Sequence, residues 1–280
     1  MNPYEPIPMR IARTNVETDD QTLKTFELVF EQDADRERFF SLYHPGQFCQ
    51  LSIFGKGEAP FGVASAAWEG EFVRFTINKM GVLTQAIHEM QPGDQLGMRG
   101  PLGNWYPVED WKGSNIVIIG GGYAFTTLYA LAKHLLNPAI RRQYGRMTVI
   151  YGARNPSLFL YKSDIECWYE RDDIACCQTI DHADERWCHL VGYVPDVTRE
   201  VAPSAENAVA FVCGPPVMIK YTLPVLYDLG FSADRIYTSL EKRMKCGIGK
   251  CGRCNIGHKY ICKDGPVFTF AELQELPQDL

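Results

Sequence analysis

The sequence has no long apolar run. Nowhere in its 280 residues do apolar side chains approach the roughly 20 consecutive positions that a membrane-spanning helix needs, so we expect no transmembrane segment. It also has no excess of basic residues: 28 Lys and Arg stand against 34 Asp and Glu, which argues against nucleic acid as a partner. The N-terminal segment lacks the apolar core of a secretory signal. We expect a cytoplasmic protein because of the many thiols and the cysteine loop described next.

Cysteine, in contrast, is plentiful and unevenly placed. Ten cysteines are present, too widely spread for a small disulfide scaffold. Near the end of the chain four of them follow the spacing C-x4-C-x2-C-x7-C, and these are Cys246, Cys251, Cys254 and Cys262. The first three match the plant-type ferredoxin loop, in which a fourth thiolate from further along completes the ligands of a [2Fe-2S] cluster. The pattern predicts such a cluster here.

The residues around these cysteines fit the same interpretation. Gly247, Gly249 and Gly252 allow the positive φ angles with which a loop turns its backbone N–H groups toward sulfur. A structural zinc site is the alternative, although zinc ligands usually come in two close pairs and only one C-x2-C pair is present. His258 lies between the third and fourth cysteines, but a Rieske centre needs two histidines. We interpret the remaining cysteines as reduced and mostly buried.

The first hundred residues alternate apolar and polar side chains in short runs separated by turns. This pattern predicts a small antiparallel β-barrel. The predicted strands lie at residues 9–16, 22–31, 47–54, 72–78 and 94–100, and a helix is predicted at 82–90.

The pattern changes after residue 114. A continuous apolar run at 115–120 predicts a strand buried on both faces. Strands and helices then alternate, which predicts a parallel α/β sheet with right-handed crossovers. The further strands are expected at 147–152, 174–180, 208–214 and 235–240, and the helices at 123–136, 163–171, 194–201 and 216–229.

Two segments of the barrel region point to a ligand. One is Ala59-Pro60-Phe61-Gly62; the other, residues 77–84, passes through Gly81 into a helix whose free N–H groups suit a pyrophosphate. Together they resemble the flavin domain of the ferredoxin-NADP reductase superfamily. In that family an Arg-x-Tyr-Ser strand holds the flavin and a glycine-led helix takes the pyrophosphate. In this chain alanine, phenylalanine and glycine replace the arginine, tyrosine and serine.

The resemblance implies that this region binds FAD. Phe61 would stack on the edge of the flavin ring, Gly62 would offer a backbone N–H near the flavin N5, and Lys79 would supply the charge that the missing arginine supplies elsewhere. The implied FAD-binding residues are Ala59, Pro60, Phe61, Gly62, Ile77, Asn78, Lys79, Gly81, Leu83 and Thr84.

Three segments at the carboxyl ends of the later strands are similar to the nucleotide site of the same superfamily. They read GGGYAFTTL, YGARN and CGPPVM. Ligands of parallel sheets bind at this edge, and the resemblance implies that NAD or NADP does so here. The implied residues are Gly120, Gly121, Gly122, Tyr123, Arg154, Cys213, Gly214 and Pro215.

The glycine-rich segment departs from the family pattern at two positions. The family continues it as Gly-x-Gly-x-x-Pro, whereas this chain has Ala124 at the second glycine and Thr127 at the proline. Retained nucleotide binding is one interpretation. The other is a site filled by Tyr123 and Phe125, which would leave an FAD and [2Fe-2S] relay that no longer turns over NAD(P)H.

The order of barrel, nucleotide sheet and cysteine loop resembles one branch of the superfamily. That branch includes the gamma subunits of sulfhydrogenase-type [NiFe] hydrogenases, the corresponding subunit of anaerobic sulfite reductase and the electron-transfer subunit of dihydroorotate dehydrogenase. The motif carrying the resemblance runs from Ser239 to Phe268, SLEKRMKCGIGKCGRCNIGHKYICKDGPVF. It implies an FAD-binding barrel at 1–111, an NAD(P)-binding domain at 112–240 and a cluster-binding tail at 241–280.

The implied function is electron transfer between NAD(P)H, FAD, the cluster and an iron-sulfur partner subunit of a larger redox complex. A zinc-stabilised interaction module without redox activity is the third alternative.

Overall fold

The first half of the chain forms a curved antiparallel sheet. The computed structural model describes residues 2–277, so the outermost residues of the first and last predicted domains, 1 and 278–280, lie outside the described residues. In the described part this sheet has the order β4-β3-β6-β1-β2-β5. Its strands are β1 (Ile7–Val16), β2 (Leu23–Phe30), β3 (Phe48–Ile53), β4 (Gly57–Gly62), β5 (Val73–Asn78) and β6 (Gln95–Leu102).

The two outer strands of this sheet approach each other. The Ala64 N–H, just beyond β4, donates to the Arg74 carbonyl of β5 at 2.8 Å, and the Arg74 N–H donates to Ser65 Oγ at 3.0 Å. These bonds curve the sheet into the predicted barrel. Its interior is filled by apolar side chains from every strand, among them Met9, Phe26 and Phe75.

Two parts of this region differ from the prediction. No strand was predicted between residues 54 and 72, but Gly57–Gly62 form β4. Pro60 is tolerated because β4 is the last strand in the sheet order, where one edge needs no ladder partner. The helix α1 (Asp33–Leu42) was not predicted, because it is charged on most sides and buries only Phe39. The predicted helix at 82–90 is α2 (Val82–Glu89).

The second half contains the predicted parallel sheet. Its order in the described residues is β10-β9-β8-β7-β11-β12-β15, parallel except for the last pair. The strands are β7 (Asn115–Gly121), β8 (Met147–Ala153), β9 (Ile174–Ile180), β10 (Leu190–Val191), β11 (Ala208–Cys213), β12 (Ile236–Ser239) and β15 (Val267–Thr269).

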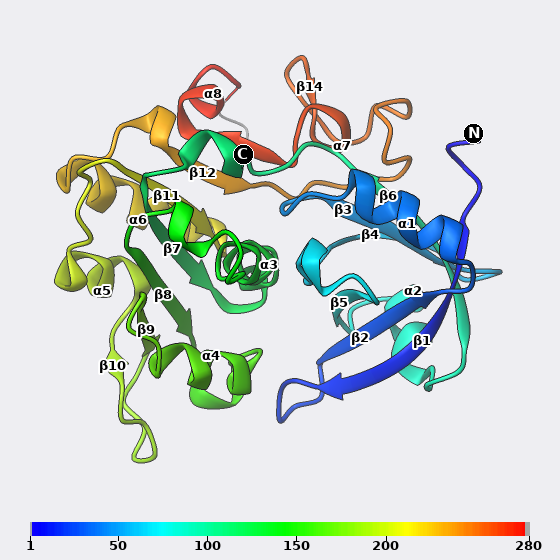
Figure 1. The fold of residues 1–280 in the computed structure, drawn as a ribbon, viewed down its shortest axis with the longest axis horizontal. Helices are drawn as coiled ribbons and strands as arrows, with labels where there is room; N and C mark the ends of the chain where they lie inside the picture. The colour runs from blue at the N-terminus through cyan, green and yellow to red at the C-terminus, as the bar shows by residue number, and fades with distance from the viewer. Residues whose placement is uncertain (1, 278–280) are drawn as a thin grey trace.

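Helices cover both faces of this sheet. Figure 1 shows α3 (Phe125–Leu135) and α4 (Lys162–Tyr169) between the sheet and the barrel, and α5 (Val194–Val201) and α6 (Pro216–Asp228) on the far face. The helix α5 coincides with its prediction; α3 is preceded by a 3₁₀ turn over Gly122–Ala124. The two faces have separate apolar clusters, and the one under α3 and α4 continues into residues of the barrel.

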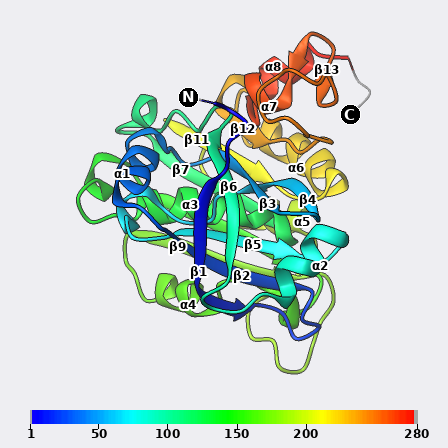
Figure 2. The ribbon, with the colours of Figure 1, turned by 90° about the vertical axis from the view of Figure 1, so that its right-hand side faces the viewer.

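The tail packs on both preceding regions. It contains the hairpin β13 (Asn255–Ile256) and β14 (Lys259–Tyr260), then α7 (Ile261–Asp264), β15 and α8 (Phe270–Gln274). The strand β15 joins the large sheet as the antiparallel neighbour of β12, and Phe48 of β3 packs into the apolar cluster of the tail. Figure 2 shows the N-terminus and the tail at the same end of the molecule. The boundary predicted at residue 240 remains a prediction.

Candidate functional site

A cleft of about 1590 Å³ lies where the barrel, the parallel sheet and the tail meet. One wall is the flavin segment predicted from the sequence, and the opposite wall is the edge of the parallel sheet. The tail residues 241–245, immediately before the first cysteine of the predicted cluster loop, complete the lining. The predicted residues that line the cleft are Ala59, Pro60, Phe61, Gly62, Asn78, Thr84, Tyr123, Cys213 and Gly214.

The strand β4 forms the barrel wall of the cleft. Pro60 and Gly62 alternate with Phe61, whose ring packs into the barrel core and is only 8% exposed. Stacking of Phe61 on a flavin therefore remains a prediction. Ile77 and Leu83 are also core residues and do not line the cleft.

The N-terminus of α2 presents backbone donors beside this wall. Thr84 Oγ1 accepts the N–H groups of Met80 and Gly81 at 2.9 and 2.8 Å. The first N–H bonded within the helix is that of Gln85, to the Gly81 carbonyl at 2.8 Å, so the N–H groups of the first turn are available to a ligand. Lys79, predicted to meet a phosphate, is exposed next to this turn but outside the cleft lining.

The three glycines at the end of β7 have different roles. A Cβ at Gly120 would lie 2.3 Å from the Phe125 ring, and one at Gly121 would lie 2.3 Å from the Met218 sulfur. Gly122 has φ +55° and open space where a side chain would be, so a ligand can approach its backbone closely. Phe125 does not fill the site, because it is fully buried and stacks on Tyr151 with the ring centroids 3.8 Å apart.

Tyr123 and Cys213 both line the cleft on the side of the parallel sheet. The Tyr123 hydroxyl donates to the Thr76 carbonyl of the barrel at 2.8 Å, so this side chain joins the two walls. Cys213 is 6% exposed at the end of β11; burial raises the pKa of its thiol, and Glu241 of the tail adds to this effect. Cys213 is therefore a neutral thiol at neutral pH.

Gly62 and Thr127, two positions at which this chain departs from the ferredoxin-NADP reductase pattern, lie next to each other. A Cβ on Gly62 would lie 2.6 Å from Thr127 Cγ2, and Thr127 Oγ1 lies 3.8 Å from Cys213 Sγ. Glycine at 62 and threonine at 127 thus fit each other sterically. Thr127 lines the cleft; its methyl group faces Gly62, and its hydroxyl faces the Ala124 carbonyl and Cys213.

Other predicted nucleotide residues lie away from the cleft. Arg154 is exposed beyond the end of β8 and does not line the cleft, and neither does Pro215. Their proposed contact with NAD(P) stays a prediction. The sequence reasoning missed the tail residues 241–245, Thr127, and the side of α6 that lines the cleft between Pro216 and Leu223.

The cysteine loop has its N–H groups turned toward sulfur. Gly247, Gly249 and Gly252 have φ of +74°, +71° and +73°, as predicted. The Lys250 N–H donates to Cys246 Sγ at 3.2 Å, and the Gly249 N–H donates to Cys262 Sγ at 3.1 Å. Such bonds stabilise thiolates and sulfides, so the backbone fits an iron-sulfur cluster.

Two further backbone bonds connect the four cysteines in pairs. The Cys251 N–H donates to Cys246 Sγ at 3.4 Å, and the Cys262 N–H donates to Cys254 Sγ at 3.5 Å. Among residues 2–277, no three His, Cys, Asp or Glu side chains are grouped as ligands of a single metal ion. A two-iron cluster requires two thiolates on each iron, and the assignment of Cys246, Cys251, Cys254 and Cys262 as its ligands stays a prediction.

The four cysteines differ in the pKa of their thiols and in their exposure. Burial of the Cys246 thiol raises its pKa, but backbone N–H groups led by that of Ile248 outweigh this effect and lower the pKa to about 6. Burial of Cys262 and the neighbouring Cys254 raise the pKa of Cys262 to about 12, and a metal ion is needed to hold it as a thiolate. Cys251 is exposed at the surface, whereas Cys254 and Cys262 are buried.

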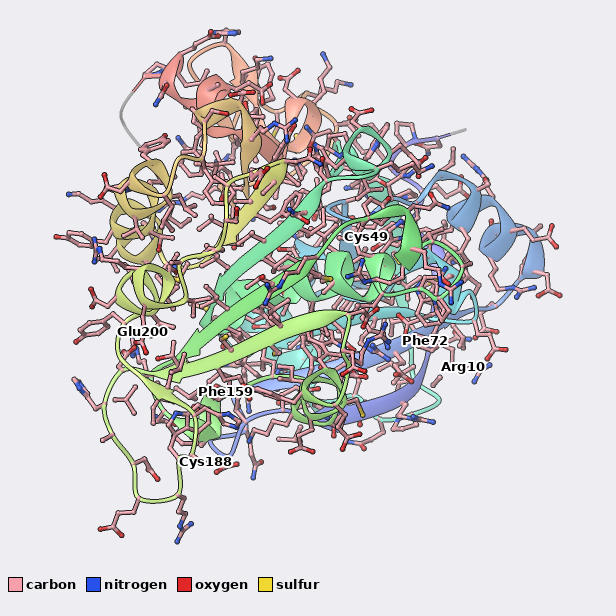
Figure 3. All side chains as sticks on the ribbon, turned by 60° about the vertical axis from the view of Figure 1, so that its left-hand side comes forward. Arg10, Cys49, Phe72, Phe159, Cys188 and Glu200 are labelled. Carbon is pink, nitrogen blue, oxygen red and sulfur yellow. The ribbon has the colours of Figure 1, made fainter. Side chains whose placement is uncertain are left out.

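The prediction that the remaining cysteines are mostly buried is wrong, because Cys49 and Cys213 are buried whereas Cys167 and Cys188 are exposed and the other two are half-buried. Figure 3 shows Cys49 on the barrel side and Cys188 in a loop at the opposite end of the molecule from the tail. No helix within residues 2–277 is long and apolar enough to cross a bilayer.

Two family models match the chain. One, described as the oxidoreductase NAD-binding domain, matches residues 118–223, and the other, described as the iron-sulfur cluster binding domain of dihydroorotate dehydrogenase B, matches residues 241–274. The barrel, the parallel sheet and the iron-sulfur tail therefore define a ferredoxin-NADP reductase-like oxidoreductase. A structure of an NADH-dependent reduced ferredoxin-NADP oxidoreductase, studied for flavin-based electron bifurcation, has the same fold: its TM-score is 0.74 at 22% identity, covering 96% of this chain and 90% of that one.

Full-length relatives define the family more narrowly. The chain is 34% identical to sulfhydrogenase 1 subunit gamma of Pyrococcus furiosus, over 99% of this chain and 94% of the relative. It is 35% identical to a probable dihydroorotate dehydrogenase B (NAD(+)) electron transfer subunit of Thermococcus kodakarensis, over 82% of this chain and 87% of the relative. The chain belongs to the family of these electron-transfer subunits.

Proposed function

We propose that the chain is an electron-transfer subunit that binds FAD and a [2Fe-2S] cluster and exchanges electrons between NAD(P)H and a partner protein. The observation that carries the proposal is the composition of the cleft. A single cavity of about 1590 Å³ is lined by the flavin segment of β4, the nucleotide edge at Tyr123 and Cys213, and residues 241–245 just before Cys246. A flavin bound there would lie between the nucleotide edge and the cluster loop.

Each wall has a defined task in this proposal. A bound flavin supplies the conversion between two-electron hydride transfer and one-electron steps. The chain supplies the position: Pro60 and Gly62 form the flavin wall, and the first turn of α2 offers N–H donors for the pyrophosphate of the flavin. Gly122 is not part of the cleft lining but precedes Tyr123, which is, and it offers the close backbone approach that the nucleotide pyrophosphate needs. The neutral thiol of Cys213 borders the place proposed for the nicotinamide.

The loop also suggests where the partner binds. Cys251, the exposed cluster ligand, lies between the exposed side chains of Lys250 and Arg253. Residues 241–264 contain seven Lys and Arg against two Asp and Glu, although the whole chain is acidic. A partner that receives electrons here would be an iron-sulfur protein with an acidic surface next to its own cluster. The relatives named above are themselves called subunits, and we propose a cytoplasmic redox complex for this chain as well.

The experiment is anaerobic purification followed by cofactor and kinetic analysis. We expect one FAD, two irons and two acid-labile sulfides per chain, and bleaching of the flavin band when NADH or NADPH is added. Comparison of the two nucleotides decides between NAD and NADP. A preparation without iron, sulfide and flavin would contradict the proposal, and zinc without sulfide would favour the interaction module.

A relay without nucleotide turnover is the second candidate. It is favoured by Ala124 and Thr127 in the glycine-rich segment and by Tyr123, which lines the cleft and bonds across it to the Thr76 carbonyl. It is opposed by Phe125, which is packed under the sheet edge and leaves the space at Gly122 open. Flavin that dithionite bleaches, but neither NADH nor NADPH does, would identify this candidate.

A further inference from the structure

Arg99 of β6 joins the flavin wall to the cysteine loop. Its side chain is 5% exposed, and Nε and Nη2 donate to the two carboxylate oxygens of Glu58 at 2.7 and 2.6 Å. The same Nη2 donates to the carbonyl of Cys246 at 3.2 Å. Glu58 precedes the flavin segment directly, and Cys246 is the first proposed cluster ligand. One guanidinium therefore contacts both segments.

The N-terminal segment completes this contact. Arg99 Nη1 donates to the Pro3 carbonyl at 2.8 Å, and its guanidinium lies 5.9 Å from the centre of the Tyr4 ring. Lys250, next to the exposed cluster ligand, lies 5.6 Å from the same ring. Tyr4 is thus placed between two cations, one on the barrel and one on the loop. The residues of this contact come from four separate parts of the sequence.

Gln50 provides an independent observation at the same place. It pairs with Arg99 on one side and with Pro60 of the flavin wall on the other, in the register of β3. Its side chain is fully buried, yet neither Nε2 nor Oε1 has a hydrogen-bond partner in the part of the chain that the structure describes. Its Nε2 lies 3.6 Å from the position of a Cβ on Gly247, which places the amide directly beneath the cysteine loop.

A buried amide without partners needs an explanation. Leucine would fill the same volume without the cost of burying two polar atoms. The amide lies between the flavin wall and the cysteine loop, the two places where the proposed cofactors present acceptor atoms. A hydrogen bond to one of these cofactors would satisfy it.

We propose that Arg99 and Gln50 are positioning residues that fix the cluster loop against the flavin wall and set the cluster's reduction potential. The inference rests on the proposed function. Arg99 holds the backbone of Cys246 at a constant separation from Glu58, while the Gln50 amide donates a hydrogen bond from beneath the loop. Net charge and hydrogen bonds near the sulfurs are what set cluster potentials, so both residues act on the cluster without being ligands.

The test uses the full-length holoprotein and three variants. Arg99→Lys keeps the charge but loses the planar fork that holds Glu58 and Cys246 together. Gln50→Leu keeps the volume and removes the amide. Arg10→Lys is the matched control, because Arg10 forms an exposed ion pair with Glu31 at 3.2 Å on the same barrel, and Figure 3 shows it far from the tail.

The readouts are the EPR spectrum of the reduced cluster, its midpoint potential, and the rate of electron transfer from flavin to cluster in stopped flow. We expect Arg99→Lys to broaden the EPR signal and slow the transfer, since the loop is no longer held in one position. We expect Gln50→Leu to shift the potential to more negative values, since a hydrogen bond to the electron-rich reduced cluster is lost. The Arg10→Lys control should match the unsubstituted protein in all three readouts.

The outcome that overturns the inference is equally specific. If Arg99→Lys and Gln50→Leu both keep the EPR spectrum, the potential and the transfer rate of the unsubstituted protein, the two residues serve the fold alone. Iron, sulfide and FAD contents are measured for each variant, so that loss of the cluster is distinguished from its displacement. Failure of the proposed function would already be visible in the unsubstituted protein, as missing cofactors.

Discussion

The contact between Gly62 and Thr127 makes a quantitative prediction about stability. Replacing Gly62 by Ala adds a Cβ 2.6 Å from Thr127 Cγ2, closer than two carbon atoms can approach without a shift. Gly62 is not among the residues with positive φ, so the backbone itself accepts alanine and the cost is steric. Thr127 can relieve the clash by turning about χ1, at the expense of its contacts with Ala124 and Cys213.

The expected loss of stability depends on how easily Thr127 rotates away. Overpacking of a well-packed site costs about 1–3 kcal/mol, and because Thr127 can rotate, we expect about 1 kcal/mol for Gly62→Ala. For a chain of this size that corresponds to a Tm lower by roughly 2–4 °C. Thr127→Ser removes the methyl group and keeps the hydroxyl. In that background, Gly62→Ala should cost close to nothing.

The assay is a double-mutant cycle with thermal melts of four proteins at one fixed FAD concentration, since bound ligand raises the apparent stability. The two single variants, the double variant and the unsubstituted protein are compared. We expect a coupling of about 1 kcal/mol between the two positions. Additive effects, within the ~0.3–0.5 kcal/mol typical of independent sites, would refute the argument that the two departures from the family pattern compensate each other.

Three further predictions concern the cluster, the pH dependence and the tail. Cys251→Ser should abolish iron and sulfide binding while FAD is retained, whereas Cys188→Ser, an exposed cysteine far from the loop, should leave both contents unchanged. Burial lowers the pKa of His88 and His134 below 6.5, so at acidic pH the unfolded chain binds more protons than the folded chain. The stability of the fold should therefore be complete above pH 6.5 and decline below it. We expect a lower denaturant midpoint at about pH 5.5 than at 7.5. The Asn104 side chain makes three hydrogen bonds of 2.7–3.1 Å to the backbone of the tail. Asn104→Ala should therefore destabilise the protein by about 2–3 kcal/mol and speed amide hydrogen exchange in the tail. Unchanged exchange in the tail would contradict this role.

The helices and strands with a clear pattern of apolar and polar side chains could be predicted from the sequence. Alternation in the first hundred residues and the buried run at 115–120 indicated an antiparallel and a parallel sheet, and both are present. The helix α1 escaped prediction because its charges leave no apolar face. The strand β4 was obscured by Pro60, which is compatible with a strand only at the edge of a sheet, and edge position is a property of the tertiary fold.

Contacts between segments that are far apart in the sequence could not be predicted from it. The cysteine spacing predicted a cluster loop, and the positive φ angles of its glycines were confirmed. The fit of Thr127 to Gly62 joins residues on α3 and β4, and the bond of Arg99 to Cys246 spans 147 positions. Neither residue type carries a local signal for these roles. Both contacts depend on how the barrel, the parallel sheet and the tail pack together.

The antiparallel pairing of β15 with β12 has a consequence for shortened proteins. Deleting the chain from residue 241 onward would remove more than the iron centre, because it would uncover the hydrogen-bonding edge of β12 and the apolar surface around Phe48. A bare edge of this kind recruits strands from other molecules. Such a truncation would therefore yield an aggregating product rather than a simpler flavin reductase, and point substitution of the cysteines is the cleaner way to silence the cluster.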